Sequence, residues 1–336
     1  MKNYLFIGGT EGNTGPDNVN KGIVSNLPSD FYFVSGGNKV KKYIDTFRYT
    51  LICSVIIVSG MSKIGMYAMK MARLLKKKTI YIMHGCCEIE FALNEMPVNK
   101  KSLKYERYFL KYSDLILPVS KRYSQMIQEK YPFCKGRIDF LHNGVDKIEL
   151  NNSDVQREKG RVIAVGGDRK LKNNLVVAKA MSKMDGNKQL FVFGHLYNPD
   201  NLEQEKNLEF KGLVSQKQLY KEMMKSELFI LNSLCESFGL SVFDALFCGC
   251  SILVSNVVGA LDLLDVTEHD IIYDPMNEDE IAEKIEYLLK HPNNNRLLSS
   301  LDFDKISYKA EVRRLQQFCD ELCQKTGVNV INENGM

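Results

Sequence analysis

Long apolar segments are missing from this 336-residue chain. The longest apolar run, Leu51 to Ser59, is far shorter than the ~20 residues that a membrane-spanning helix needs. The first residues, Met1 to Ile7, pass directly into a strand pattern and glycines, so they lack the profile of a secretory signal peptide. We therefore expect a cytoplasmic protein that does not cross a membrane.

Paired cysteine motifs are also absent. The nine cysteines include no C-x2-C pair, and several of them, such as Cys53, Cys248 and Cys250, lie inside apolar stretches. An odd number without framework spacing indicates reduced thiols rather than disulfides or zinc ligands. The one Asp-x-Asp pattern, Asp302 to Asp304, follows the last predicted strand. We therefore expect neither a metal site nor a bound cofactor.

Two common phosphate-binding patterns are missing as well. The glycine-rich segment Gly8 to Gly15 follows a predicted strand, Tyr4 to Ile7, but it contains neither G-x-G-x-x-G nor the P-loop pattern. A dinucleotide-dependent oxidoreductase is therefore the least favoured enzyme class. We expect the glycines to let a ligand approach the backbone, ahead of a helix from Asn18 to Ser25.

Charge is spread unevenly along the chain. The net charge is +4, yet residues 1–150 hold 23 Lys and Arg against 13 Asp and Glu, and the remainder is acidic. A basic surface attracts anionic lipid headgroups, so an anionic membrane surface is one candidate partner. An ordinary solvated surface is the alternative. No nucleic-acid-binding motif accompanies the charge, so we expect no nucleic-acid partner.

Strand and helix patterns alternate through the chain, whose length corresponds to two domains of about 150 residues each. This alternation favours parallel sheets covered by helices on both faces, with ligands bound beyond the carboxyl ends of the strands. Further strands of the first half are predicted at Phe31–Val34, Val55–Val58, Thr79–Met83 and Leu115–Leu117.

The most informative stretch runs from Phe229 to Gly259. The junction between its polar loop and the following helix would present backbone N–H groups and a positive dipole end to phosphate or sugar oxygens. Glu236 and Asp244, eight residues apart, can face one cleft and accept hydrogen bonds from hydroxyls. The predicted elements are a strand at Glu227–Leu231, a loop at Cys235–Leu240, a helix at Ser241–Phe247 and a strand at Ser251–Val254.

This stretch resembles the signature loop of the retaining family-four glycosyltransferases of GT-B fold. The family carries Glu-x7-Glu, and here Asp244 stands in place of the second Glu. Two other segments resemble the family: Pro118–Lys121, and His142–Asp146, which we interpret as an Asn-Gly turn with positive φ at the domain crossover. The resemblance implies an α/β protein with two Rossmann-like domains facing across a cleft. These are an acceptor-side domain at 1–150, a nucleotide-sugar domain at 151–305 and a C-terminal helix in 306–336 that crosses back, predicted at Tyr308–Gln324.

The resemblance also implies the roles of particular residues. Glu236 would hold the donor sugar, and Asp244 would bind the ribose hydroxyls. Arg169 and Lys172 would bind the diphosphate, with Lys170 open as an alternative to Lys172. His84 is implied as a fourth catalytic residue close to the donor sugar, followed by two candidate acceptor-orienting carboxylates. Those two are Glu88 and Glu90, and the remaining implied donor-binding residues are Gly15, Val214, Ser237, Phe238, Gly239 and Leu240.

The implied reaction is a retaining, metal-independent transfer of a sugar from a nucleotide diphosphate sugar to an acceptor hydroxyl. A UDP-sugar is the favoured donor, and a glycan or lipid-linked glycan is the expected acceptor. The expected setting is cell-surface polysaccharide or glycan assembly, with the protein cytoplasmic or peripheral on the inner face of the membrane. A non-hydrolysing nucleotide-sugar epimerase, which shares the architecture, and an inactive GT-B partner subunit are the alternatives.

Overall fold

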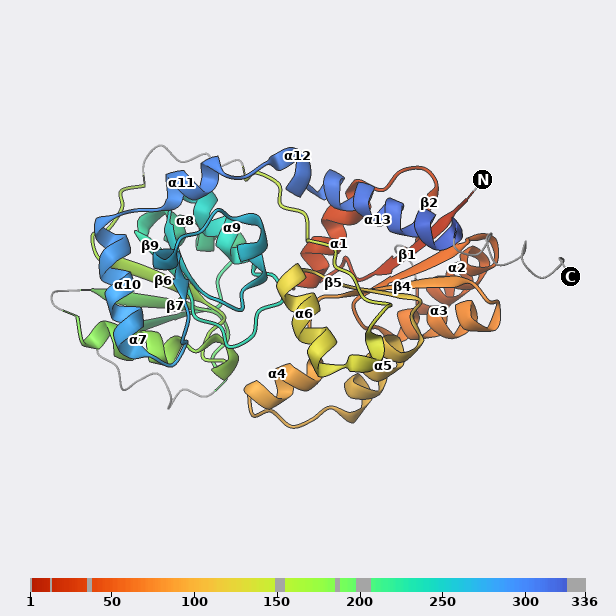
Figure 1. Ribbon diagram of the computed structural model, residues 1–336, viewed down its shortest axis with the longest axis horizontal. Coiled ribbons are helices and arrows are strands. Elements are labelled where there is room, and N and C mark those ends of the chain that lie inside the picture. Colours follow the sequence, from red (N-terminus) through yellow and green to blue (C-terminus); the bar gives the residue numbers. More distant parts are fainter. Residues whose placement is uncertain are drawn as a thin grey trace, which may run out of the picture. The chain divides into compact units, whose positions relative to one another are not determined.

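The computed structural model describes residues 2–12, 14–34, 38–148, 155–184, 188–197 and 207–324. The chain divides into two compact units, which are coloured by sequence in Figure 1. We call residues 1–88, 98–146 and 303–336 the N unit, and residues 89–97 and 147–302 the C unit. Within the described residues, no helix is both long and apolar enough to cross a bilayer.

A five-stranded parallel sheet forms the centre of the N unit. Its strand order is β2-β1-β3-β4-β5, and β3 is buried along its whole length, as expected for a parallel strand that helices cover on both faces. Leu5, Ile7 and Ile56 pack with Ala68 and Ala72 of a covering helix. The strands are β1 (Tyr4–Gly8), β2 (Phe31–Phe33), β3 (Val55–Ser59), β4 (Lys78–Met83) and β5 (Leu115–Pro118).

The helices of the N unit begin where polar side chains cap them. Thr14 and Asp17 form a capping box, so α1 begins at Gly15, three residues earlier than predicted. The helix at the C-terminus, α13, packs against α1, β3 and β4 and belongs to the N unit. The helices are α1 (Gly15–Ser25), α2 (Lys39–Ile52), α3 (Lys63–Leu74), α5 (Lys100–Tyr112), α6 (Lys121–Lys130), α12 (Phe303–Ile306) and α13 (Tyr308–Gln324), while α4 (Cys87–Leu93) spans the limit between the units.

The helix α2 was not predicted from the sequence. Thr46 and Thr50, not apolar side chains, occupy its buried face. The apolar run from Leu51 to Ser59 is in fact divided, since its first residues end α2 and the rest form β3. The pattern of apolar residues along α2 therefore marks its outer surface.

A six-stranded parallel sheet forms the centre of the C unit. Its strand order is β11-β10-β9-β6-β7-β8, so the strands β6 and β9 lie side by side in the middle. This arrangement brings the loops that follow β6 and β9 to the same edge of the sheet. The strands are β6 (Arg161–Val165), β7 (Gln189–Phe193), β8 (Leu208–Gly212), β9 (Leu228–Leu231), β10 (Ser251–Ser255) and β11 (Ile271–Ile272).

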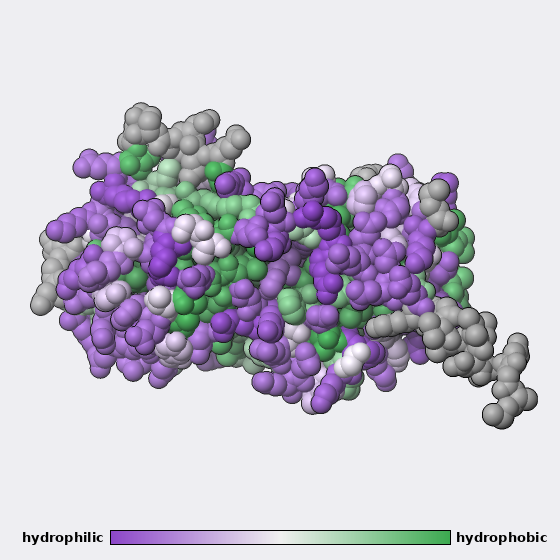
Figure 2. Space-filling model, turned by 45° about the horizontal axis from the view of Figure 1, so that its top comes forward, coloured by the Kyte–Doolittle hydropathy of each residue, from purple (hydrophilic) through white to green (hydrophobic). Residues whose placement is uncertain are grey.

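Two helices, α7 and α10, cover one face of this sheet (Figure 1). Ile281, Ile285 and Leu288 of α10 are buried against the strands. The space-filling view shows that much of the visible surface is hydrophilic (Figure 2). The C-unit helices are α7 (Asn174–Ser182), α8 (Gln216–Lys225), α9 (Leu240–Phe247), α10 (Glu278–Lys290) and α11 (Asn294–Ser299).

The segment His142–Asp146 corrects one prediction. Gly144 is not among the residues with positive φ, and the segment contains no turn. Its glycine instead allows close packing, because a Cβ on Gly144 would lie 2.5 Å from the Cα of Tyr308 in α13. The Gly144 N–H donates to the Glu311 carboxylate at 2.8 Å, and the Val145 N–H donates to the Ile306 carbonyl at 2.8 Å. The segment His142–Asp146 therefore forms the packing site, or seat, of the C-terminal helix.

Candidate functional site

Lys172 and Glu236 form an ion pair at the edge of the C-unit sheet where β6 and β9 end. Both side chains are largely buried, at 10% and 16% exposure. The Leu234 N–H donates to the Leu171 carbonyl at 2.9 Å, so the two loops are also joined through their backbones. The structure thus brings together two residues that lie 64 positions apart in the sequence.

The loop after β6 is shaped to bring Lys172 to this position. Gly166 has φ +99°, and a Cβ there would lie 2.6 Å from the Lys172 Cγ, so the glycine leaves a passage for the lysine stem. Asn173 adopts the left-handed conformation, with φ 54°, and its side chain donates to the Pro275 carbonyl at 2.7 Å. Among non-glycine residues, Asn tolerates this conformation well.

The helix α9 begins beside this ion pair. Its N-cap is Gly239, which has φ 92° and no side-chain cap, so the backbone N–H groups of the first turn face the loop that holds Glu236. Phe238 is a core residue, because its side chain is buried and stacks on Phe243 with ring centroids 5.7 Å apart. Only the main chain of Phe238 is therefore placed to contact a ligand. Leu240 and Ser237 are half-buried neighbours in the same segment.

Asp244 lies one turn into α9. Its carboxylate accepts a hydrogen bond from the Tyr220 hydroxyl at 3.3 Å. Burial raises the pKa of Asp244 to about 6, although the Tyr220 hydrogen bond acts in the opposite direction. A carboxylate with few donors around it is poised to gain stabilisation from the hydroxyls of a bound molecule.

The other two cations of the β6 loop differ in their surroundings. Arg169 is half-buried, and its Nε donates to the Gly166 carbonyl at 3.2 Å. Lys170 is exposed and pairs with Glu95, which belongs to the C unit through the segment 89–97. In the same segment, Asn94 accepts from the Leu171 N–H at 3.1 Å. Lys172, not Lys170, is therefore the lysine that faces Glu236.

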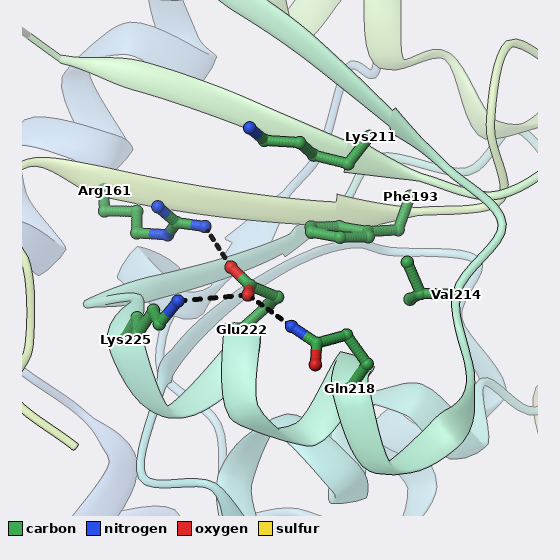
Figure 3. A pocket seen from close by; sticks show the side chains of 7 residues that line it. All are labelled: Arg161, Phe193, Lys211, Val214, Gln218, Glu222 and Lys225. Atoms are coloured by element: carbon green, nitrogen blue, oxygen red, sulfur yellow. Dashed lines mark hydrogen bonds and ion pairs between the residues drawn. The ribbon is translucent and has the colours of Figure 1, made fainter. Parts of the chain in front are cut away.

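A pocket of about 270 Å³ lies between the sheet and α8 (Figure 3). Val214 is the one predicted donor-binding residue in its lining, and Phe193 at the end of β7 lies beside it in the view. Glu222 points into the centre, where its carboxylate accepts from Gln218 at 2.8 Å and contacts Lys225 at 3.1 Å. The remaining lining residues are Arg161 and Lys211.

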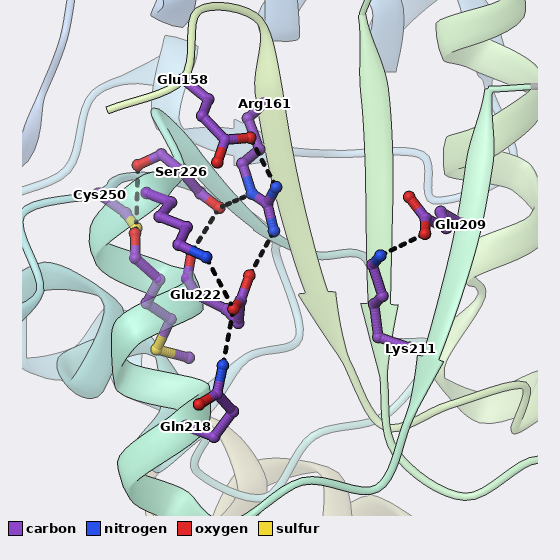
Figure 4. Close-up of polar contacts among 10 residues, drawn as sticks. Glu158, Arg161, Glu209, Lys211, Gln218, Glu222, Ser226 and Cys250 are labelled. Atoms are coloured by element: carbon purple, nitrogen blue, oxygen red, sulfur yellow. Dashed lines mark hydrogen bonds and ion pairs between the residues drawn. The ribbon is translucent and has the colours of Figure 1, made fainter. Parts of the chain in front are cut away.

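The cations of this pocket are already neutralised (Figure 4). Arg161, which is nearly buried, pairs with Glu222 at 2.6 Å and with Glu158 at 2.7 Å, and its guanidinium stacks on the Phe191 ring at 3.6 Å. Lys211 pairs with Glu209. The pair between Arg161 and Glu222 holds α8 against the sheet, and we assign the pocket a structural role beside the Val214 loop.

The glycine-rich segment of the N unit corrects a second prediction. A Cβ on Gly8 would lie 2.8 Å from the Asn20 side chain, and a Cβ on Gly12 would lie 2.2 Å from the Asp17 carboxylate. These glycines therefore make room for side chains of α1 rather than for a ligand. Gly15 differs, because no atom lies within 4 Å of the place where its Cβ would be.

His84 lies at the carboxyl end of β4 in the N unit, and its side chain is half-buried. The Asn20 amide donates to the Gly9 carbonyl at 2.9 Å, which orients its oxygen toward Ser59. The Ser59 hydroxyl donates to that oxygen at 2.6 Å and must therefore accept the hydrogen bond from His84 Nε2 at 2.8 Å. Burial lowers the pKa of His84 to about 4, so the ring is neutral at pH 7 with its proton on Nε2.

Replacing Ser59 by Ala should allow the His84 ring to adopt either of its two neutral tautomers. In the wild-type protein we expect ¹⁵N-labelled His84 to give the chemical shifts of a single Nε2–H tautomer at pH 7. In the Ser59→Ala protein we expect a mixture of the two tautomers, because the acceptor for Nε2–H is gone. A single unchanged tautomer in the variant would contradict the arrangement. The variant Ser62→Ala, which removes a hydroxyl that caps α3, is the control for general loss of structure.

Four residues that shape these sites were not predicted from the sequence: Asn20, Ser59, Gly166 and Asn94. Asn20, inside α1, and Ser59, the last residue of β3, are buried polar residues, and their placement can be recognised only when the strand and helix limits are known. Glu88, suggested to orient an acceptor, is held by Tyr131, Lys130 and Arg107, and these contacts lower its pKa. All nine cysteines are free, as predicted. Among the described residues, no three His, Cys, Asp or Glu side chains cluster as metal ligands.

Comparison with protein families gives two matches that follow one another along the chain. Residues 10–148 match the profile of Glycosyltransferase Family 4, and residues 146–300 match that of Glycosyl transferases group 1. A curated relative, an uncharacterized 41.2 kDa protein in the cps region of Klebsiella pneumoniae, is 26% identical over 213 residues. That match covers 60% of this chain and spans 58% of the relative's length.

Solved structures share the fold at low sequence identity. HepE of Anabaena, determined in complex with UDP and glucose, has a TM-score of 0.69 at 12% identity and covers 96% of this chain and 100% of its own. WaaB, a lipopolysaccharide outer core galactosyltransferase in its apo form, has a TM-score of 0.66 at 12% identity. The match with WaaB covers 94% of this chain and 98% of its own. The fold is that of the two-domain, Rossmann-like GT-B proteins.

Proposed function

Since the chain belongs to the family-four glycosyltransferases of GT-B fold, we propose that it transfers a sugar from a nucleotide diphosphate sugar to an acceptor hydroxyl, with retention of anomeric configuration. The observation that carries this proposal is the contact between Lys172 and Glu236. It lies at the carboxyl ends of two neighbouring parallel strands and beside the N-terminus of α9. This is where phosphate and sugar oxygens bind in open α/β sheets.

Positive charge at this edge would stabilise the departing diphosphate. The Lys172 ammonium has three donor hydrogens, and its contact with Glu236 uses one of them, so two can bind phosphate oxygens. Arg169 and the backbone N–H groups at Gly239 and Leu240 would add further donors. Fixed donors of this kind are commonly the largest contribution to catalysis. Because the protein supplies the cations, we propose that transfer requires no metal ion.

The carboxylates would hold the rest of the donor. Glu236 would accept hydrogen bonds from the sugar hydroxyls, and Asp244 would accept them from the ribose. The main chain at Val214 would contact the base, and Ser237 would lie beside the sugar. We favour a UDP-sugar because HepE was solved with UDP and glucose and with UDP-glucose. On the N unit, His84 and Gly15 are the residues that we assign to the donor sugar and phosphates.

We place the reaction in cell-surface polysaccharide or glycan assembly in the cytoplasm, with a glycan or lipid-linked glycan as acceptor. Two comparisons support this setting. WaaB is named as a lipopolysaccharide outer core galactosyltransferase, and the Klebsiella pneumoniae relative is named for its position in a cps region.

Thermal unfolding with a panel of nucleotides would test donor binding. UDP, GDP, ADP and their sugar conjugates should be compared with and without EDTA. A cognate nucleotide at 100 times its Kd stabilises a folded protein by about 2.7 kcal/mol, which raises the melting temperature by a measurable amount. We expect UDP to do so in EDTA. Absence of any shift across the panel would contradict the proposal.

Product analysis would then separate transfer from the two alternatives. An epimerase converts the sugar of the donor without an acceptor, and an inactive partner subunit binds the nucleotide without turnover. A retaining transferase releases UDP only as the acceptor is consumed, and NMR of the anomeric proton shows the same configuration in donor and product. We expect this last result, and inversion at the anomeric carbon would contradict retention.

A further inference from the structure

The helix α2 (Lys39–Ile52) exposes its apolar side chains. Val40, Ile44, Phe47 and Leu51 recur at the spacing of one helical face, and they are 66%, 53%, 39% and 45% exposed. Figure 2 shows hydrophobic surface at the right-hand margin, the side on which Figure 1 places α2. A water-facing helix normally presents polar residues on its outer face, so this arrangement is inverted.

The buried face of α2 is correspondingly polar. Thr46 and Thr50 are fully buried against the N unit. Their hydroxyls donate to the carbonyls of Lys42 and Thr46, each at 2.7 Å, so the helix backbone itself satisfies them. The helix is therefore stable in its observed orientation, and rotation would not bury its apolar stripe without exposing these threonines.

Positive charge surrounds the apolar stripe. Residues 39–78, which form α2, β3, α3 and the turn before β4, contain ten Lys and Arg and a single acidic residue, Asp45. Their net charge of +9 accounts for most of the basic excess of the first 150 residues. Arg48 and Lys41 lie on the outer half of α2 and are exposed. The excess is thus concentrated in the one stretch of sequence that contains α2 and α3.

The end of α3 extends this surface. The Lys77 ammonium donates to the Leu51 carbonyl at 2.9 Å, which joins the last turn of α2 to the turn after α3. Leu74, in that last turn of α3, is 75% exposed. The rings of Tyr43 and Tyr67 meet edge to face, with centroids 5.1 Å apart, and fix the two helices together. We call the exposed residues of α2 with Leu74 the α2 face.

We propose that the α2 face docks on an anionic lipid bilayer. Apolar side chains of an interfacial helix enter the boundary between headgroups and acyl chains, while flanking lysines and arginines contact anionic headgroups. The combination of an exposed apolar stripe with a net positive surround matches this partner in both chemistry and charge. The proposal is independent of the transferase reaction, because no residue of the α2 face is among those assigned to the donor.

Co-sedimentation of the full chain with vesicles tests this proposal without nucleotide or acceptor. We expect binding to phosphatidylcholine vesicles that contain about one third phosphatidylglycerol, and at least roughly tenfold weaker binding to phosphatidylcholine alone. Raising the salt above about 0.5 M should weaken binding, because the charges are exposed to solvent. The double variant Ile44→Glu, Phe47→Glu should bind anionic vesicles at least roughly tenfold more weakly.

A matched variant separates this face from general hydrophobicity. Phe133→Glu removes an aromatic residue of the N unit that is 55% exposed outside α2, and it should bind vesicles as the wild type does. Circular dichroism should show that all variants are folded. Equal vesicle binding by the wild type and the double variant would overturn the proposal. The proposal would also be overturned if the wild type formed a dimer in solution, the double variant were monomeric and neither bound vesicles. The α2 face would then be an interface between two copies of the chain.

Discussion

Replacing Lys172 by Met should lower the rate of sugar transfer by a factor of roughly 10²–10³, the usual cost of removing one preorganised electrostatic donor. Glu236→Gln should cost a similar factor, because the amide cannot accept as strongly from sugar hydroxyls and no longer holds the lysine. Initial rates measured at saturating donor, with release of nucleotide coupled to a spectrophotometric assay, would give both numbers.

The stability of the same variants distinguishes a functional pair from a structural one. Each single change leaves one largely buried charge without its partner, so unfolding in urea should show a loss on the order of 3 kcal/mol. The double variant Lys172→Met, Glu236→Gln leaves no unpaired charge and should recover most of that loss. Its activity should stay as low as that of the single variants. Recovery of activity together with stability would show that the pair only maintains the fold.

Lys170→Met is the matched control for this experiment. Lys170 lies two residues from Lys172 but is exposed and pairs with Glu95. An exposed ion pair contributes little to stability, so the variant should unfold like the wild type. Its transfer rate should remain within about threefold of the wild type, since no more than one distant donor is lost. A larger loss than that of Lys172→Met would assign the diphosphate to Lys170 instead.

Replacing Asp244 by Asn should stabilise the protein at neutral pH and weaken its binding of nucleotide. Burial raises the pKa of Asp244 to about 6. At pH 7 the folded protein therefore contains an ionised carboxylate whose free energy would be lower in water. A neutral amide of the same size removes that cost, on the order of 2 kcal/mol. It also removes a charged acceptor for ribose hydroxyls, so the Kd for UDP should rise about tenfold or more.

The pH dependence of this effect has a definite sign. In the unfolded chain Asp244 loses its proton near its ordinary pKa of 3.8, whereas in the folded chain it does so near 6. Its contribution to stability is therefore most favourable below about pH 4 and is lost as the pH rises through about 6. The stability advantage of Asp244→Asn should accordingly be larger at pH 7.5 than at pH 5, when both are measured by urea unfolding.

Nucleotide binding by the wild type should follow the opposite trend. Above about pH 6 the carboxylate can accept from ribose hydroxyls, so the affinity for UDP should increase as the pH rises from 5 to 7.5. This increase should be smaller in Asp244→Asn. A parallel increase in both proteins would exclude Asp244 from the ribose site. Asp244→Glu restores the side chain usual in the family and should bind UDP at least as tightly as the wild type.

Much of the fold follows directly from sequence pattern. The strands β1, β2, β3 and β4 were predicted within one residue of their observed limits, and α13 was predicted at its observed limits, because long apolar or amphipathic periods leave few alternatives. The candidate site was predicted for a related reason. Loops that follow parallel strands meet at one edge of the sheet, so Lys172 and Glu236 were expected to lie close together. Their direct ion pair was not predicted and is seen only in the structure.

Other features could not be predicted because they depend on tertiary contacts. The glycines at Gly8 and Gly12 suggested an open ligand loop, but side chains of α1 fill the space above them. The Asn-Gly pair at Gly144 suggested a turn, but a helix distant in sequence occupies its place. The helix α2 has its apolar face outward, so a rule that equates apolar with buried gives no clear assignment.

The seat of the C-terminal helix has a consequence for biosynthesis. Gly144 and Val145 find their partners in Glu311 and Ile306, so the first unit to leave the ribosome must wait for the last stretch of chain to be translated. Until then the nascent protein exposes apolar surface on β3 and β4 that α13 later covers, and such surface attracts chaperones and aggregation. A transcript truncated shortly before its end would therefore yield a chain with an intact C unit and an unfinished N unit.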